Sequence, residues 1–332
     1  MYLKKLILFI PVFLTIYGIN EYNKHTSLYN NPLGSIDSEQ WVQESPLQFF
    51  IGFVINIFID NLNLTYWIVV ILGFLFLLFS LIKFDQKIFN GNQIMKILYF
   101  SPFYLIIFYW MGKPDTFITG SLFLLTSFNG SFLISGFAIF VMIFSHPQVT
   151  LIYFVLIRYL DIIKLKIEHY IFLFLGFLIY NFYLMQLSQF ESRYDFIIKD
   201  LDRILDTIFT NTLAGFISLF MWLWIPIFLS GLIRDKKFIL SFFLIFFISF
   251  FTLDHTRIFM ILSIPLIIYL ISKREFLESF STIFENKIMY ILGLFQIQKR
   301  ADGRIVDGNN LSENIIFQEL MSELINFIKK FI

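Results

Sequence analysis

Long apolar runs separated by short charged clusters dominate the sequence. The run FILSFFLIFFISFF at 238–251, for example, contains no charged residue. Runs of this kind suit α-helices that cross a hydrocarbon core of roughly 30 Å. A membrane-spanning barrel would instead show segments of about ten residues that alternate between apolar and polar side chains. The pattern therefore predicts an all-α, polytopic integral membrane protein.

The apolar runs mark about ten candidate transmembrane helices, near residues 6–20, 64–82, 95–111, 116–128, 131–145, 147–160, 170–187, 209–233, 238–251 and 258–272. The topology depends on residues 116–145, which form either two short helices separated at Asn129-Gly130 or one kinked helix. Lys and Arg favour short cytoplasmic loops. Two helices keep later basic clusters such as RDKK at 234–237 on the cytoplasmic side, whereas one helix would move them outside. We therefore predict two helices here, with both termini cytoplasmic.

This topology divides the chain into two parts. Residues 1–274 form the predicted transmembrane domain, whose long periplasmic loops are 21–63 and 188–208. The first segment has a basic start but no small-residue cleavage site, so we expect an uncleaved span. Residues 275–332 form a cytoplasmic tail, in which apolar positions between Leu311 and Ile328 share one face of an amphipathic helix.

The composition agrees with a membrane protein and argues against several other classes. Hydrophobic residues make up 58% of the 332 residues and charged residues only 15%, against about a quarter in soluble domains. A net charge of +1 argues against a nucleic-acid partner. No Cys is present, so the chain has neither a disulfide framework nor a thiolate metal site. The runs at 116–145, 209–233 and 238–251 hold no Asp, Glu, Lys or Arg, which disfavours an ion-coupled carrier.

The stretch FFTLDHTRIFM at 250–260 brings three ionisable side chains to the predicted periplasmic start of the last span. In a purely structural interpretation, Asp254 or a neighbouring Thr caps the helix, Arg257 reaches the membrane interface and His255 is incidental. In a functional interpretation, the planar fork of Arg257 binds the diphosphate of a lipid carrier. His255 or Asp254 then takes the proton of an attacking sugar hydroxyl. The sequence permits both interpretations.

Five further residues on the predicted periplasmic side are candidates for substrate binding. Lys113 offers a second phosphate contact, or else anchors its loop at the interface. His146 follows a middle span and is either a turn residue or part of the site. Asp37 and Glu44 belong to an acidic, turn-rich loop that suits sugar binding. Arg193 opens an amphipathic segment that forms either a solvated face or a lid over the sugar.

The order of these parts resembles the Wzy-type O-antigen polymerases and the related EpsG-like exopolysaccharide polymerases. The resemblance is carried by the basic start of the first helix, by Asp37 and Glu44-Ser45-Pro46 ahead of an amphipathic stretch, and by FSHPQ around His146. It implies a metal-independent glycosyltransferase of the bacterial inner membrane that uses no cofactor. Such an enzyme transfers a growing glycan from undecaprenyl diphosphate onto the next lipid-linked repeat unit at the outer face. Its partners are the undecaprenyl-diphosphate-linked oligosaccharide, the lipid bilayer and a chain-length regulator protein.

Our hypothesis assigns roles in this reaction to the cluster before the last span. Arg257 would stabilise the leaving diphosphate, and His255 or Asp254 would be the base on the acceptor hydroxyl. The main alternative is a lipid-linked oligosaccharide flippase or polysaccharide exporter, which usually has more spans and a cationic central cavity. A membrane acyltransferase would need a His on an early span, and the early spans have none. A non-catalytic scaffold is the remaining alternative.

Overall fold

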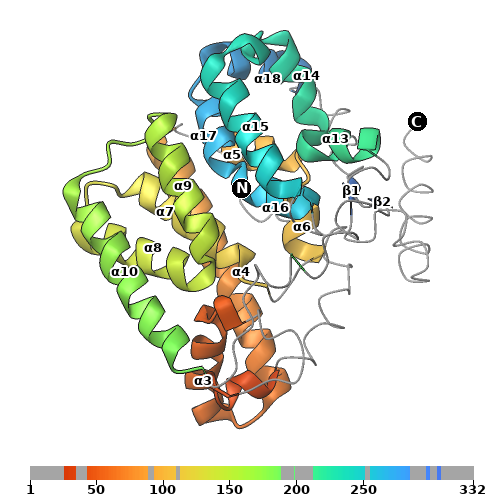
Figure 1. The fold of residues 1–332 in the computed structure, drawn as a ribbon. Helices are drawn as coiled ribbons and strands as arrows, with labels where there is room; N and C mark the ends of the chain where they lie inside the picture. The colour runs from red at the N-terminus through yellow and green to blue at the C-terminus, as the bar shows by residue number, and fades with distance from the viewer. Residues whose placement is uncertain are drawn as a thin grey trace.

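The structure is a computed structural model that describes residues 26–34, 43–88, 93–109, 113–187, 198, 212–250, 255–284, 297–299 and 305–307. This part of the chain is helical apart from one short antiparallel hairpin (Figure 1). Its elements are η2 Thr26–Tyr29, α3 Leu47–Ile59, α4 Leu62–Ile88, α5 Gln93–Tyr99, α6 Phe103–Tyr109, α7 Asp115–Ser127, α8 Phe132–Ser145, α9 Pro147–Tyr159, α10 Ile167–Met185, α13 Thr212–Phe220, η4 Met221–Leu223, α14 Trp224–Leu229, η5 Leu232–Arg234, α15 Lys236–Phe250, α16 His255–Leu262, α17 Ile264–Ile271, α18 Arg274–Phe284, β1 Ile297–Lys299 and β2 Ile305–Asp307. The predicted all-α class is confirmed.

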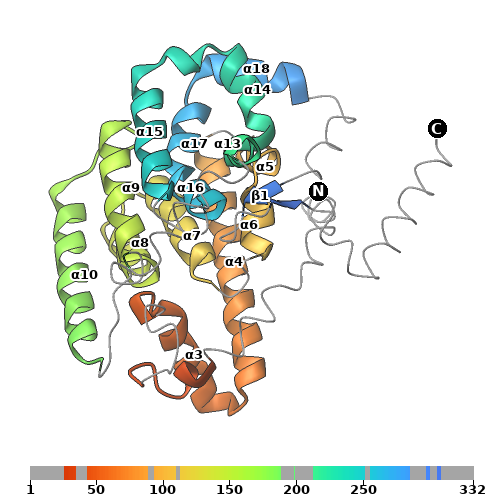
Figure 2. The ribbon, with the colours of Figure 1, turned by 45° about the vertical axis from the view of Figure 1, so that its right-hand side comes forward.

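Two of the described helices, α4 and α10, could cross a bilayer by their length and composition. They contain 27 and 19 residues, and in their most apolar stretches only 39% and 22% of the residues are buried inside the protein. Helix α10 lies at the edge of the bundle in both views (Figures 1 and 2). Its exposed side includes Phe174, Phe182 and Met185. Because such a surface is unfavourable in water, these helices favour a membrane environment.

The region 116–145 forms two helices, as predicted. Helices α7 and α8 are separated by a turn in which the Ser131 N–H donates to the Phe128 carbonyl at 2.8 Å. Every residue of α7 is buried, and this helix packs against α4 on one side and α8 on the other. At Gly120 a Cβ atom would lie 2.9 Å from the ring of Phe76 and 3.2 Å from the Leu77 Cα. The close approach of α7 to α4 therefore requires a glycine at this position.

The prediction of one continuous helix over 95–111 is wrong, because the structure has α5 and α6 there. Between them the chain turns at Phe100 to Pro102. Proline has no N–H and disfavours helical conformation in the residue before it. The Ser101 hydroxyl accepts a hydrogen bond from the Phe103 N–H at 3.2 Å and so begins α6. The same hydroxyl donates to the Leu98 carbonyl at the end of α5.

The predicted span at 209–233 is also broken, into α13, η4, α14 and η5. Met221 adopts a left-handed backbone conformation with φ of 51°, which is uncommon for a residue with a Cβ atom. The following Trp222 N–H leaves the helix and donates to the Phe100 carbonyl at 3.2 Å. The two broken helices therefore meet through a backbone hydrogen bond. The argument against a carrier weakens accordingly, because broken helices often mark transport sites.

The last predicted span, 258–272, begins earlier than expected. Helix α16 starts at His255 and passes into α17 at Ser263, two residues before Pro265. Helix α18 then packs on the core through Phe276, Phe280 and Phe284. The hairpin lies beside α6, α13 and α16. The amphipathic helix predicted around 311–328 lies outside the described residues.

The helix directions define two ends of the bundle. At the first, called the Asp115 end, α7 and α16 begin and α8 passes into α9 at His146. At the second, called the Asp161 end, α9 and α17 finish and α15 begins. The upright course of α9, α15 and α17 between these ends is visible in Figure 2.

Candidate functional site

A buried ion pair joins α16 to α7 at the Asp115 end. The Arg257 Nε atom donates to Asp115 Oδ2 at 2.7 Å, and Nη2 donates to Oδ1 at 2.9 Å. The two side chains are only 11% and 2% exposed. One planar guanidinium therefore holds both oxygens of one carboxylate, which is the strongest geometry for such a pair. The partners are 142 residues apart in the sequence.

Local sequence explains how each partner reaches the pair. Asp115 follows Pro114 and occupies the first turn of α7, where the helix dipole favours a negative charge. Arg257 lies in the first turn of α16, and its two neighbours fix that turn. His255 Nδ1 lies 2.8 Å from the Ser249 carbonyl oxygen at the end of α15. The Thr256 hydroxyl lies 2.7 Å from the Ser218 hydroxyl on α13. Three consecutive residues thus bind three different helices.

The contact of His255 with Ser249 also assigns the proton on the imidazole ring. A carbonyl oxygen can only accept a hydrogen bond, so Nδ1 must carry the hydrogen. In the neutral ring, Nε2 then has the lone pair and can accept a proton. His255 is buried. Its geometry is therefore that of an oriented base.

Tyr153 on α9 connects the ion pair to its surroundings. Its hydroxyl donates to the Ile261 carbonyl of α16 at 2.7 Å, and the ring lies within electrostatic reach of Asp115. Thr119 is one turn beyond Asp115 on the same face of α7 and is also near the Tyr153 hydroxyl. The Thr119 Oγ1 atom is buried, and the Tyr153 hydroxyl is a polar group within its reach. Helices α7, α9 and α16 thus contribute polar groups to one buried cluster.

A second polar group surrounds Glu44. Its carboxylate accepts a hydrogen bond from Gln148 Nε2 at 2.8 Å, and its backbone carbonyl accepts one from the Tyr180 hydroxyl at 3.1 Å. His146 lies two residues before Gln148 and is buried. Gln148 and Tyr153 are five residues apart on α9, a rise of about 7.5 Å. Two of the predicted residues, Glu44 and His146, therefore belong to the same end of the bundle as Arg257.

Of the four remaining predicted site residues, the structure describes only Lys113. Lys113 is half-buried and lies two residues before Asp115. Asp37, Arg193 and Asp254 lie outside the described residues.

Sequence reasoning gave Asp115 no functional role and missed its pairing with Arg257. The available signal was Pro114-Asp115 before an apolar run, which is a helix start with an acid in its first turn.

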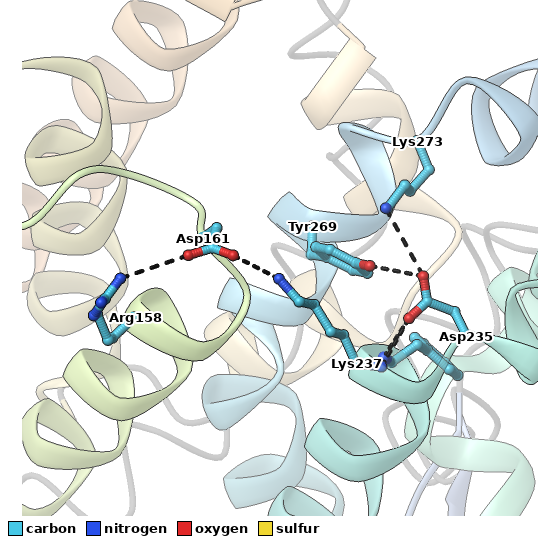
Figure 3. Close-up of polar contacts among 7 residues, drawn as sticks. Arg158, Asp161, Asp235, Lys237, Tyr269 and Lys273 are labelled. Atoms are coloured by element: carbon cyan, nitrogen blue, oxygen red, sulfur yellow. Dashed lines mark hydrogen bonds and ion pairs between the residues drawn. The ribbon is translucent and has the colours of Figure 1, made fainter.

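Exposed ion pairs link α9 to α15 at the Asp161 end (Figure 3). Asp161 contacts Lys237 at 2.5 Å and Arg158 at 3.7 Å. The hydrogen bond from Lys237 lowers the pKa of Asp161, and the same bond raises the pKa of Lys237. Asp161 and Arg158 are 64% and 74% exposed. Water screens such pairs strongly, so they tie the two chain segments together only weakly.

Asp235 links α15 to α17 at the same end. It accepts hydrogen bonds from the Tyr269 hydroxyl at 2.7 Å and from the Lys237 N–H at 2.8 Å, and it lies 3.8 Å from Lys273 (Figure 3). Burial alone would raise the pKa of Asp235, but the hydrogen bonds from Tyr269 and from backbone N–H groups outweigh it and lower that pKa. Lys237 and Lys273 belong to basic loops that were predicted to lie on one side of the membrane, and both loops lie at this end of the bundle.

No group of three His, Asp or Glu side chains within the described ranges is placed to hold a metal ion. Comparison with known proteins adds no relative from which a role could be transferred. No protein-family model matches the chain, and neither the curated proteins nor the solved structures contain a significant match. The functional argument therefore rests on the residues themselves.

Proposed function

We propose that this chain is a multi-pass polysaccharide polymerase of the bacterial inner membrane. In this proposal it transfers a glycan from undecaprenyl diphosphate to the next lipid-linked repeat unit at the outer face. The observation that carries the proposal is the buried ion pair of Arg257 and Asp115 at the ends of α16 and α7. An arginine held in place among apolar helices, near the membrane surface, suits the phosphates of a lipid carrier.

The distribution of charge supports the orientation. Arg158, Lys237 and Lys273 meet at the Asp161 end, and such basic clusters favour the cytoplasm. The Asp115 end then faces the periplasm. Ten spans in all would bring both termini to the cytoplasmic side.

The residues of the Asp115 end can supply the chemistry of glycosyl transfer. The charge of Arg257 offsets the negative charge that develops on the diphosphate as the glycosidic bond breaks. His255, with its Nδ1 hydrogen directed to Ser249, takes the proton of the acceptor hydroxyl at Nε2. Glu44, His146 and Lys113 then bind sugar hydroxyls and phosphate at the entrance to the site.

The second candidate is an exporter or flippase for the same lipid-linked oligosaccharide. It is favoured by the two broken helix pairs, α5 with α6 and α13 with α14, which meet where the Trp222 N–H donates to the Phe100 carbonyl. Irregular backbone within a membrane is tolerated where it is buried in protein or lines a cavity. The described residues around this junction are mainly apolar, so it offers no evident contact for an oligosaccharide.

Glycan analysis of a deletion strain separates the two candidates. We expect the strain without this protein to carry one repeat unit on each acceptor, whereas loss of a flippase would leave none. Complementation with Arg257→Ala should leave single repeats, and Arg257→Lys should restore little because a lysine lacks the planar fork. Arg158→Ala, an exposed arginine at the other end, serves as the control and should restore the long ladder. A long ladder from a well-expressed Arg257→Ala protein would refute the assignment.

A further inference from the structure

Helices α4 and α8 share an exposed apolar surface. On α4, Leu75 and Phe79 lie one turn apart, and both are exposed. On α8, Leu133 and Phe137 are also one turn apart and exposed. The two helices pack on the buried α7 and meet where the rings of Phe76 and Phe137 lie 6.3 Å apart in an edge contact. We call Leu75, Phe79, Leu133 and Phe137 the α4–α8 surface.

The last turns of α4 add two lysines to the edge of this surface. Lys83 and Lys87 are one turn apart. The Lys87 ammonium donates to the Ser127 carbonyl at the end of α7. Because α7 begins at the Asp115 end, this hydrogen bond places the end of α4 at the Asp161 end. The proposed orientation assigns that end to the cytoplasm.

Both ammonium groups lie against aromatic rings. Lys83 Nζ is 5.7 Å from the centre of the exposed Phe79 ring, and Lys87 Nζ is 5.3 Å from the centre of the Phe128 ring. An aromatic face attracts a cation, but it has no net charge with which to neutralise it. In the part of the chain that the structure describes, no carboxylate contacts either lysine. Two positive charges therefore lie next to exposed apolar side chains.

The packing of α4 against α8 brings the lysines and the apolar side chains to matching depths. Helix α4 approaches the cytoplasmic end and α8 leaves it, and they meet at Phe76 and Phe137. Leu133 lies four residues before Phe137, about 6 Å closer to the cytoplasm. Phe79 lies about 4.5 Å beyond Phe76 in the same direction, and Lys83 a further 6 Å or so. One ligand can therefore contact Leu133 and Phe79 while it reaches Lys83.

We propose that the α4–α8 surface binds an anionic phospholipid of the cytoplasmic leaflet. Its phosphate lies at Lys83 and Lys87, and its acyl chains lie along the exposed side chains of α4 and α8. Lysines at the cytoplasmic membrane surface attract anionic lipids, and the neighbouring apolar side chains need a hydrocarbon partner. The inference goes beyond the proposed function and takes from it only the orientation in the membrane.

Two other occupants match this surface less well. A second copy of the chain in a twofold dimer would bring its own Lys83 and Lys87 to the same interface, where like charges repel each other. A free phosphate would bind the lysines but leave the apolar side chains uncovered. A phospholipid provides both the negative charge and the hydrocarbon.

Native mass spectrometry of the purified full-length protein in detergent tests the proposal. The protein is titrated with phosphatidylglycerol and, in parallel, with phosphatidylcholine that has the same acyl chains. We expect wild type to bind phosphatidylglycerol about fivefold more tightly, or more. Lys83→Gln keeps a long polar side chain but removes the charge, so it should weaken phosphatidylglycerol binding about fivefold and leave phosphatidylcholine binding unchanged. Lys83→Arg keeps the charge and should stay within about twofold of wild type.

Arg158→Gln is the matched control, because Arg158 is an exposed base at the same end that already contacts Asp161. It should bind phosphatidylglycerol as wild type does. Equal losses in Arg158→Gln and Lys83→Gln would mean that the lipid responds only to net charge, and would overturn the proposal. Equal binding of both lipids by wild type, or unchanged phosphatidylglycerol binding by Lys83→Gln, would also overturn it.

The same spectra identify the other occupants. Displacement of phosphatidylglycerol by glycerol 3-phosphate would indicate a soluble phosphate ligand, and a dimer without bound lipid would indicate a second copy of the chain. Either result would overturn the phospholipid site. Because the measurement uses no glycan substrate, its outcome does not depend on the assignment as a polymerase.

Discussion

Replacing Arg257 by Gln and Asp115 by Asn, separately and together, measures how strongly their ion pair joins α16 to α7. Removal of one partner from a buried pair costs about 3–5 kcal/mol. Arg257 is 11% exposed and Asp115 2%, so water compensates only a little, and we expect each single variant to lose about 2–4 kcal/mol. Asn and Gln can still bond to each other in the double variant. The resulting coupling energy should be about 2 kcal/mol.

The assay is equilibrium unfolding of the four proteins in mixed detergent micelles, followed by tryptophan fluorescence. The control is the same cycle at Arg274 and Glu278, which contact at 2.6 Å but are 88% and 62% exposed. That pair should show no measurable coupling energy, because water solvates its charges in both the folded and the unfolded state. If the losses at Arg257 and Asp115 simply add, the two side chains do not pair as described.

The remaining predictions concern topology, pH and packing. Because the chain has no cysteine, a single introduced cysteine can be labelled specifically with a membrane-impermeant maleimide. Asn31→Cys should react in intact spheroplasts, whereas Lys236→Cys should react only after permeabilisation. Asp235→Asn should lower the melting temperature at pH 7, and the difference should vanish as the pH falls below about 3.8 through the lowered pKa of Asp235, where its charge and its contribution are lost. Gly120→Ala should destabilise the protein by about 1–3 kcal/mol by forcing α7 from α4, whereas Gly130→Ala, with open space around it, should leave the unfolding transition unchanged.

Much of the helical pattern could be predicted from the sequence. Helices α7 and α8 appear where Asn129-Gly130 interrupts the apolar run, because these residues favour a turn. Helices α10 and α15 coincide within a few residues with the runs at 170–187 and 238–251. In each case the signal is local. Apolar residues continue for the length of one helix and end at charged or turn-forming residues.

The helix breaks illustrate what a local pattern cannot predict. Within the run 95–111, Pro102 indicates a helix boundary, because helices usually end at or before the residue that precedes a proline. Nothing in the sequence near Met221 indicates a helix end. A methionine does not favour a left-handed backbone by itself, so this conformation depends on the packing of the folded protein. The Trp222 N–H finds its acceptor at Phe100, far away in the sequence. A continuous apolar run therefore predicts burial well and helix continuity poorly.

The candidate site was predictable in its composition but only partly in its arrangement. Arg257 and His255 stand out because ionisable residues are scarce in this chain, and the structure brings Glu44 and His146 to the same end of the bundle. Asp115 did not stand out, since an acid at a helix start has an ordinary explanation. Its significance comes from a partner on another helix, 142 residues away.

Each end of the bundle has an ion pair between an arginine and an aspartate, which is exposed at the Asp161 end and buried at the Asp115 end. This difference in burial favours a function at the Asp115 end. Arg158 and Asp161 are mostly exposed, so their charges remain hydrated and their pairing needs no explanation beyond solubility. Arg257 and Asp115 are buried, and moving both charges out of water is so unfavourable that well-packed apolar side chains often stabilise a protein as well or better. Stability alone therefore does not account for this pair. The diphosphate site that we propose would account for it, because such a site needs a positive charge held among apolar helices.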